Sequence, residues 1–379
     1  MRVRRSRLLM AGVAMGTALA VTAVVPGIGL AHSQGGATAT TIASGLDNPR
    51  GLTFGPDGHL YVAEAGRGGA GPCMTGPEGG EVCFGASGAI TKIHKGKQHP
   101  VISGLPSLAE PEGGSAIGPS DVSFNRHGQL YFTVGLGADP AVRADLPELG
   151  QRAMGWLLRA KGWNKWRQIA DIAGFEAAAN PDGGLPDSNP NSVLATKRGQ
   201  YVVDAGGNSL MFVAPNGNVS TVAVFPDRMV PAPPQLGLPP GTKIPMQSVP
   251  TSVVQGPDGA LYVGELTGFP FQVGSARVHR IVPGKAPQVV ATGFTNIIDI
   301  GFDRHGKLYV LEIAHNGLLS GDPTGALLRV SHGKSKIVYS QGLTMPGGLA
   351  LKHGSAYVSN CSVCAGAGTI EKISLPYHR

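Results

Sequence analysis

A short stretch of alternating apolar and polar residues recurs along this chain. Its first copy, residues 49–64, reads Pro-Arg-Gly-Leu-Thr-Phe-Gly-Pro-Asp-Gly-His-Leu-Tyr-Val-Ala-Glu. Similar stretches occupy residues 119–134, 190–204, 250–265, 297–312 and 346–360. Six copies of one phrase indicate a repeat architecture, in which each copy is one supersecondary unit that packs on its neighbours.

Each copy has the pattern of a β-hairpin. Two runs with period-two alternation flank a polar turn that ends in glycine, as in Pro56-Asp57-Gly58 and Arg126-His127-Gly128. Further apolar runs after each hairpin predict a third and a fourth strand. The third strands are expected at 89–94, 155–160, 209–214, 276–282, 326–331 and 368–374. The fourth are expected at 100–103, 167–172, 219–224, 287–292 and 336–340. Four strands per repeat form the blade of a β-propeller.

The two ends of the chain complement each other. The last repeat has no fourth strand, whereas an unpaired strand pattern at residues 40–46 precedes the first hairpin. The pattern therefore predicts an all-β, six-bladed β-propeller with four-stranded antiparallel blades. We expect one domain over residues 38–376, with the N-terminal strand completing the last blade and removing an exposed sheet edge. The alternative is an open sandwich or barrel.

The long insertions gather on one face of this predicted propeller. Connections from second to third strands and from fourth to first strands lie on the same face, and they hold the segments 66–87, 104–118, 135–153, 174–189, 226–249, 267–275 and 314–325. Long loops on a rigid scaffold commonly carry binding sites. We therefore expect the site on this loop face, at the mouth of the axial channel, with the Pro-rich segment 226–249 acting as a stiff strap.

Polar residues recur on this face at equivalent positions of the blades. Second strands end in Glu64, Asp204, Glu265, Glu312 and Asn360, and first strands begin near Arg50, Asp121, Asn191 and Asp299. Oxygen ligands at this density favour a hard cation, above all Ca²⁺. We therefore predict a metal site at Glu64, Asp204, Glu265 and Glu312. Alternatively, these acids are solvated or are neutralised by Arg50.

Ligand contacts are expected from other polar residues of the same face. The candidates are Arg50, Asp121, Asn191, Asp299, Asn360 and His315. His315 lies three residues after Glu312, where it would serve as a general base, a metal ligand or a solvated loop residue. The sequence contains neither a Gly-x-Ser-x-Gly elbow nor a phosphate-binding loop, so it identifies no catalytic residue and leaves enzymatic activity undecided.

The first residues predict export. Arg2, Arg4, Arg5 and Arg7 precede an uncharged run that ends at Ala31, which is the pattern of a secretory signal peptide over residues 1–31. An uncleaved anchor is the alternative. Removal of this leader takes away four Arg and no acid, so the net charge falls from +7 to +3. We expect a secreted monomer that binds a small molecule or a protein, without nucleic acid and without a further membrane span.

Four cysteines in an exported chain are expected to form disulfides. They fall into two groups, Cys73 with Cys83 and Cys361 with Cys364, and three connectivities are possible. The local pairs require the least coincidence. Cross-pairing between the first and last blades is the alternative, because these blades are neighbours in the closed ring.

Several phrases together resemble one family. Asn48-Pro-Arg-Gly-Leu, Glu64-Ala-Gly-Arg-Gly-Gly, Gly79-Gly-Glu-Val-Cys83, Asp187-Ser-Asn-Pro190 and Ile298-Asp-Ile-Gly-Phe302 look like the ScyD/ScyE family. The resemblance implies an exported propeller and supplies no catalytic residue. More distantly, the repeat is similar to NHL repeats and to the gluconolactonase, paraoxonase and strictosidine-synthase propellers. Lactonases of this kind hold Ca²⁺ at first-strand starts, where this chain offers one good ligand, Asn191.

Three functions follow as expectations. The leading one is a propeller that binds a ligand or partner on its loop face. The second is a Ca²⁺-dependent hydrolase or lactonase that works at the axial carboxylates. The third is a scaffold that binds proteins through its rim.

Overall fold

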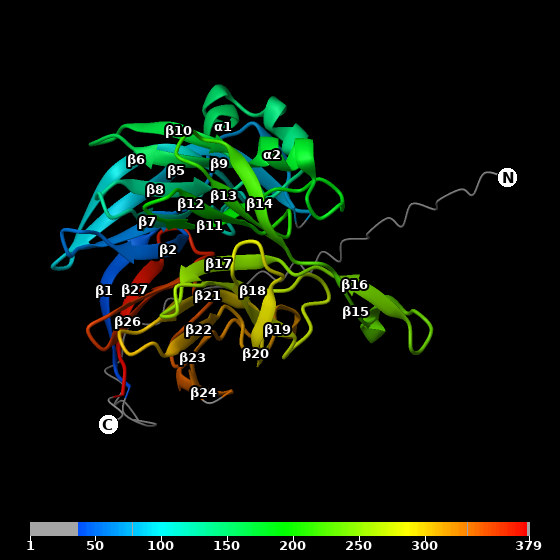
Figure 1. The fold of residues 1–379 in the computed structure, drawn as a ribbon. Coiled ribbons are helices and arrows are strands. Elements are labelled where there is room, and N and C mark those ends of the chain that lie inside the picture. The colour runs from blue at the N-terminus through cyan, green and yellow to red at the C-terminus, as the bar shows by residue number, and fades with distance from the viewer. Residues whose placement is uncertain (1–36, 78, 332, 377–379) are drawn as a thin grey trace.

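Six antiparallel sheets surround a common axis (Figure 1). The structure is a computed structural model that describes residues 37–77, 79–331 and 333–376. The innermost strands of successive sheets contact one another in a closed ring, in the order β2, β7, β11, β17, β21, β25 and back to β2. The prediction of an all-β, six-bladed propeller is confirmed.

The strands of the first three blades run outward from the axis in chain order. Blade one contains β2 (Pro49–Phe54), β3 (Leu60–Glu64), β5 (Glu81–His94) and β6 (Lys97–Ala109), with β4 (Cys73–Thr75) paired to β5. Blade two contains β7 (Pro119–Phe124), β8 (Leu130–Val134), β9 (Trp156–Ala160) and β10 (Trp166–Asp171). Blade three contains β11 (Pro190–Ala195), β12 (Gln200–Asp204), β13 (Ser209–Val213) and β14 (Val219–Val224).

The last three blades follow the same order. Blade four contains β17 (Pro250–Gln255), β18 (Leu261–Glu265), β19 (Ala276–Ile281) and β20 (Gln288–Phe294). Blade five contains β21 (Ile297–Phe302), β22 (Leu308–Glu312), β23 (Ala326–Ser331) and β24 (Lys334–Tyr339). Blade six contains β25 (Gly348–Lys352), β26 (Ser355–Asn360), β27 (Gly368–Ser374) and, outermost, β1 (Ala39–Leu46).

The recurring aromatic residues of the repeat join neighbouring blades. A tyrosine on a second strand packs edge-on against the phenylalanine that ends the first strand of the next blade. The pairs are Tyr61–Phe124, Tyr262–Phe302 and Tyr357–Phe54, with ring centroids 4.8, 4.8 and 4.9 Å apart. Such pairs contribute about 0.5–1.5 kcal/mol beyond their area burial. The repeated Tyr and Phe therefore fix the angle at which blades meet.

Strand β1 closes the ring. It pairs antiparallel with β27, and Ala39 lies opposite Ile373 while Ala43 lies opposite Ile370. Ala43 and Leu46 are buried in one apolar cluster with Leu52 of blade one. The N-terminal strand thus completes the last blade and also packs against the first, as the sequence predicts.

The loop face is built up more than the sequence predicts. Strands β5 and β6 continue to Glu81 and Ala109, well beyond the expected ranges 89–94 and 100–103. The loops also contain α1 (Glu148–Ala153), α2 (Ile172–Ala179) and the 3-10 turns η1 (Pro140–Asp145), η2 (Pro234–Leu236) and η3 (Leu318–Ser320). The strand extensions were missed because the Gly-rich segment 85–88 interrupts the apolar alternation.

The expected strap at 226–249 contains a hairpin instead. Strands β15 (Arg228–Pro231) and β16 (Lys243–Met246) pair with each other and project from the body of the propeller (Figure 1). Pro231 and Pro245 lie within these strands, where a missing N–H is tolerated because a two-stranded ribbon has two open edges.

Both predicted local disulfides are present. Cys73 is bonded to Cys83 across the β4–β5 pair, and Cys361 is bonded to Cys364 after β26. The bridge between Cys73 and Cys83 ties the long connection between β3 and β5 to the extended start of β5.

The predicted leader, residues 1–31, lies outside the described residues. Of the helices that the structure does describe, none is long and apolar enough to cross a membrane.

Ring closure can be tested by removing β1. Deletion of residues 38–44 should expose the edge of β27 and uncover the cluster around Leu52, so the melting temperature should fall by about 5 °C or more. A chain that starts at Ala37 and keeps β1 is the matched control. Equal melting temperatures of the two chains in calorimetry would show that β1 does not hold the ring.

Candidate functional site

The polar residues that end the second strands are buried. Their exposed fractions are 9% for Glu64, 0% for Asp204, 0% for Glu265, 1% for Glu312 and 9% for Asn360. Most accept a hydrogen bond from a backbone N–H just before the first strand of the same blade. The donors are Asp47 N to Glu64 (2.9 Å), Asn189 N to Asp204 (2.6 Å), Thr295 N to Glu312 (2.7 Å) and Thr344 N to Asn360 (2.7 Å). These side chains fix how the chain enters each blade.

Three of the four predicted metal-ligating carboxylates, Glu64, Asp204 and Glu312, therefore accept from donors next to strands of their own blade. Glu265 also accepts from Arg228 of β15. Among the described residues, the only three His, Cys, Asp or Glu side chains close enough to share a metal are Cys73, Glu81 and Cys83. Both cysteines are consumed by a disulfide. The structure thus does not gather the four carboxylates into one ligand group, and a cation held at any of them stays a prediction.

Burial sets the protonation of three of these acids. It raises the pKa of Glu64 and Glu312, and it raises the pKa of Asp204 to about 6. Hydrogen bonds from Ser188 and from backbone N–H groups oppose the shift at Asp204. The carboxylates are stabilised by donors of the fold, which leaves few lone pairs for a ligand.

Glu265 is the exception because it is surrounded by cations. Its Oε1 accepts from Arg228 Nη2 at 2.6 Å and from Arg277 Nε at 2.8 Å. Its Oε2 lies 3.0 Å from His279 Nε2 and 2.7 Å from Ser248 Oγ. Burial alone would raise the pKa of Glu265, but the hydrogen bonds from His279, Arg277 and Ser248 outweigh it and the pKa is lowered. Arg228 belongs to β15, so this cluster also anchors the projecting hairpin.

Residues at the first-strand starts link each blade to the next. Ser120 Oγ donates to the Pro190 carbonyl at 2.6 Å, and Asn191 Nδ2 donates to the Thr251 carbonyl at 2.6 Å. Arg50 Nη2 donates to the Ala116 carbonyl at 2.8 Å. Two of the predicted ligand contacts, Arg50 and Asn191, therefore take part in a network that joins blades.

Asp121 and Asp299 hold inner strands together from blades two and five. Asp121 accepts from Ser192 Oγ (2.8 Å) and Val193 N (2.9 Å) of blade three, and Asp299 accepts from Leu349 N (2.7 Å) of blade six. Burial raises the pKa of Asp121 to about 6. Burial and the negative charge of Asp121 raise the pKa of Asp299 well above its usual range. The two carboxylates thus repel each other across the ring.

His315 is held by Glu312. Its Nδ1 is hydrogen-bonded to Glu312 Oε2, and its backbone N–H donates to the Thr324 carbonyl at 2.8 Å. The His315 side chain is 35% exposed while that of Glu312 is 1% exposed. A buried carboxylate therefore fixes the orientation of an accessible imidazole on the loop face.

Exposed apolar side chains concentrate on the loop face. Of the eleven large hydrophobic side chains exposed in the described part of the chain, seven belong to loop-face connections: Leu185, Met229, Leu236, Leu238, Phe269, Val273 and Leu319. The others lie on outer strands or in one opposite-face turn. A Cβ on Gly317 would lie 2.9 Å from Val273, so the loops that carry Val273 and Leu319 touch. We call Phe269, Val273, His315 and Leu319 the blade four–five patch.

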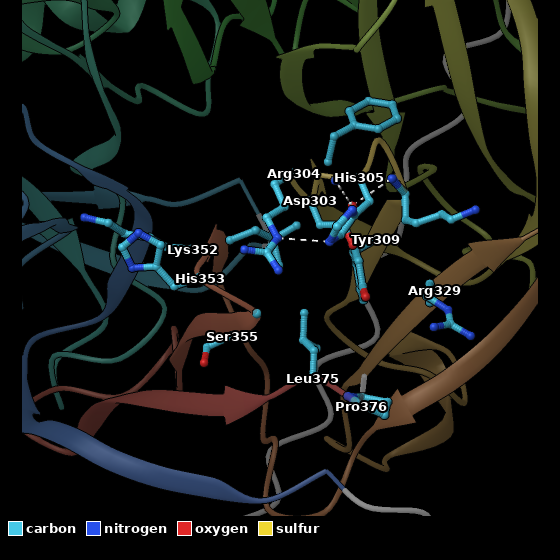
Figure 2. Close-up of a pocket in the computed structure, with 14 residues that line it drawn as sticks. Asp303, Arg304, His305, Tyr309, Arg329, Lys352, His353, Ser355, Leu375 and Pro376 are labelled. Carbon is cyan, nitrogen blue, oxygen red and sulfur yellow. Dashed lines mark hydrogen bonds between the residues drawn. The ribbon is translucent and has the colours of Figure 1, made fainter. Parts of the chain in front are cut away.

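A cavity of about 470 Å³ lies at the opposite face between blades five and six (Figure 2). Turns after β21 and β25 supply most of its wall, including Arg304, Lys307 and Lys352, with Arg329 at one side. None of the residues that the sequence predicts as a site lines this cavity. This cavity and the long loops therefore belong to different faces of the propeller.

The sequence analysis missed one group on the loop face, around Glu176 and Asp187. Both residues lie in the 174–189 segment, which also contains Asn180 and Asp182. The signal was this run of acids and amides within one connection. Recurrence from blade to blade could not identify these residues, because the segment that contains them has no counterpart in the other blades.

Comparisons with known proteins identify the architecture. No family model matches the chain, and no curated protein matches it. Among solved structures, a protein of unknown function from Bacteroides thetaiotaomicron is 10% identical with a TM-score of 0.55, covering 89% of this chain and 76% of its own. A gluconolactonase from Xanthomonas campestris is 10% identical with a TM-score of 0.52, covering 90% of each chain. A putative gluconolactonase is 12% identical with a TM-score of 0.50, covering 91% and 96%. These likenesses show the fold alone.

The Glu265 cluster gives a stability prediction. Glu265→Gln should leave Arg228, Arg277 and His279 without their counter-charge and lower the free energy of unfolding by about 3–5 kcal/mol. Because the pKa of Glu265 is lowered from 4.5, its stabilisation is present above that pH and is lost as the pH falls through the folded-state pKa. The difference in free energy of unfolding between Glu265→Gln and the unchanged protein, measured by urea unfolding, should therefore become smaller below about pH 4.

The control is Glu148→Gln on α1, where the side chain of Glu148 is 84% exposed. It should change stability by no more than about 0.5 kcal/mol. Equal effects of the two substitutions would contradict the role given to Glu265.

Proposed function

We propose that this protein binds a small molecule or a partner protein through the blade four–five patch of its loop face. The observation that carries the proposal is the concentration of exposed apolar side chains on the long loops. Contiguous exposed apolar surface is unfavourable in water and commonly marks an interaction site. In the part of the chain that the structure describes, the large apolar side chains exposed on the outer strands are Val289, Val290 and Ile337, which argues against the rim scaffold.

The charges beside the patch favour an anionic group on the ligand. Arg228 and Arg277 share one carboxylate, Glu265, and their side chains are 24% and 23% exposed. Because two guanidinium groups pair with a single carboxylate, one positive charge beside the patch is not balanced by Glu265. Arg277 follows Val273 by four residues, at the start of β19. A ligand with an apolar body and a carboxylate or similar group would therefore match both the patch and the arginines.

Kinship with the ScyD/ScyE family and export are part of the proposal. Kinship rests on phrases such as Asp187-Ser-Asn-Pro190, and export rests on the pattern of residues 1–31. The two disulfides agree with an oxidising compartment. We propose that the exported form acts as a monomer.

A screen with aromatic carboxylic acids by ligand-observed NMR tests the binding site. Combining Val273→Ser with Leu319→Ser should weaken binding of the hits about tenfold or more, because buried apolar contacts at a binding site dominate its energy. The matched control combines Val290→Ser with Ile337→Ser on outer strands and should leave binding unchanged. If the hits bind the loop variant normally but do not bind Arg304→Ala, the binding site is the opposite-face cavity and not the blade four–five patch.

The second candidate function is a hydrolase, and the Glu312–His315 pair favours it. A carboxylate that orients an exposed imidazole is the arrangement a general base requires. In such a reaction His315 would take the proton from water as the water attacks an ester or lactone carbonyl. Two solved structures of similar fold are described as gluconolactonases, one of them putative, which makes lactones the first substrates to test.

The enzymatic candidate predicts turnover of at least one member of a lactone panel. His315→Asn should then lower kcat/KM about 10²-fold to 10⁴-fold, the usual contribution of a general base. His305→Asn in an opposite-face turn is the control and should leave the rate unchanged. Absence of turnover above the uncatalysed rate across the panel would remove this candidate and leave the binding proposal intact.

A further inference from the structure

Glu176 on α2 is a buried carboxylate without a hydrogen-bond donor. Its exposed fraction is 0%, and neither of its carboxylate oxygens has a partner among the described residues. An unpaired buried polar group costs about 1–3 kcal/mol, and more when it is charged. Such a group in a folded protein calls for a compensating species.

Two further oxygens nearby are in the same condition. Asn180 Oδ1 and Asp187 Oδ1 are also buried without a donor in the part of the chain described. Asn180 is the C-cap of α2, one turn after Glu176, and its N–H donates to the Glu176 carbonyl at 2.8 Å. A helix C-terminus carries partial negative charge, which disfavours a carboxylate there and favours a cation.

The Gly206–Gly207 turn brings Glu176 and Asp187 to one place. A Cβ on Gly207 would lie 2.5 Å from Glu176 Oε2, and a Cβ on Gly206 would lie 2.8 Å from Asp187 Oδ1. The two glycines therefore make room for the two carboxylates. Both N–H groups of this turn donate to Asp204 at 3.2 Å, so they are not available to Glu176 or Asp187.

The charges that act on Glu176 are all negative. Burial, together with the negative charges of Asp204, Asp182 and Asp187, raises its pKa to about 7. Asp182 and Asp204 already have donors, Asn208 and Gly184 for the first and Ser188 and Asn189 for the second. Among the carboxylate and amide oxygens of this region that the structure describes, the unsatisfied ones thus belong to Glu176, Asp187 and Asn180.

We propose that Glu176 and Asp187, with the amide oxygen of Asn180, bind one Ca²⁺ ion beneath the Gly206–Gly207 turn. Every candidate ligand is an oxygen, which excludes the nitrogen and sulfur preference of zinc or copper. Ca²⁺ accepts carboxylate, amide and backbone oxygens in flexible geometry. The ion would tie α2 to the segment that precedes β11 and so order the loop face next to blade three.

This site is distinct from the second-strand carboxylates. Asp204 lies beside the new site, but both of its oxygens have donors in Ser188 and Asn189. Glu64, Glu265 and Glu312 have donors of their own and lie in other blades. The new site combines two carboxylates, Glu176 and Asp187, with the neutral amide oxygen of Asn180. It therefore differs from a site built of three or more acidic side chains.

Calcium titration of the purified protein after removal of metal by EGTA tests the proposal. Isothermal calorimetry should give one Ca²⁺ per chain, and saturating Ca²⁺ should raise the melting temperature by about 5 °C or more. Glu176→Gln and Asp187→Asn should each weaken Ca²⁺ binding at least about tenfold. In EGTA, Glu176→Gln should melt no lower than the unchanged protein because it relieves the repulsion, which separates lost binding from lost folding.

Glu148→Gln, an exposed glutamate of the neighbouring helix, is the control and should bind Ca²⁺ normally. Failure of the unchanged protein to bind Ca²⁺ would overturn the proposal. So would Ca²⁺ binding that persists in Glu176→Gln and Asp187→Asn, and in that case loss of binding in Glu312→Gln would place the ion at the second-strand carboxylates instead.

Discussion

Pairing of the first strand with the last sheet is the constraint on which the rest of the structure depends. Strand β1 satisfies the open edge of β27 and buries Ala43 and Leu46 against blade one. Closure brings blades one and six into contact, and only then does the inner ring return from β25 to β2. The long loops are therefore held by a rigid ring, because the inner strand of every blade contacts the inner strands of both neighbouring blades.

The fold could be predicted because its determinants are local and repeated. Alternation of apolar residues and a turn that ends in glycine recur in the blades and can be recognised without knowledge of distant contacts. Loop-face structure could not be predicted in the same way. The extension of β5, the β15–β16 hairpin and helix α2 each occur once, and their conformation depends on packing against a body that must form first.

The candidate site shows the same division. The sequence identified which polar residues share a blade position, but it could not say what each one contacts. Glu64 and Asn360 fix the entry of the chain into a blade, Glu265 pairs with two arginines, and Asp121 joins strands of neighbouring blades. The polar residues that recur from blade to blade therefore have structural roles. Glu176 has no counterpart in other blades, so recurrence could not identify it.

Glu265 and Glu176 show why burial alone does not assign a role to an acid. Both are fully buried, yet hydrogen bonds from His279, Arg277 and Ser248 lower the pKa of Glu265, whereas burial and three acidic neighbours raise that of Glu176. The charge of Glu265 is matched by the fold itself and stabilises the folded state. The charge of Glu176 is unmatched by any described residue, so its stabilisation must come from outside the chain, from a proton or a cation. A buried acid of the second kind is the better indicator of a site.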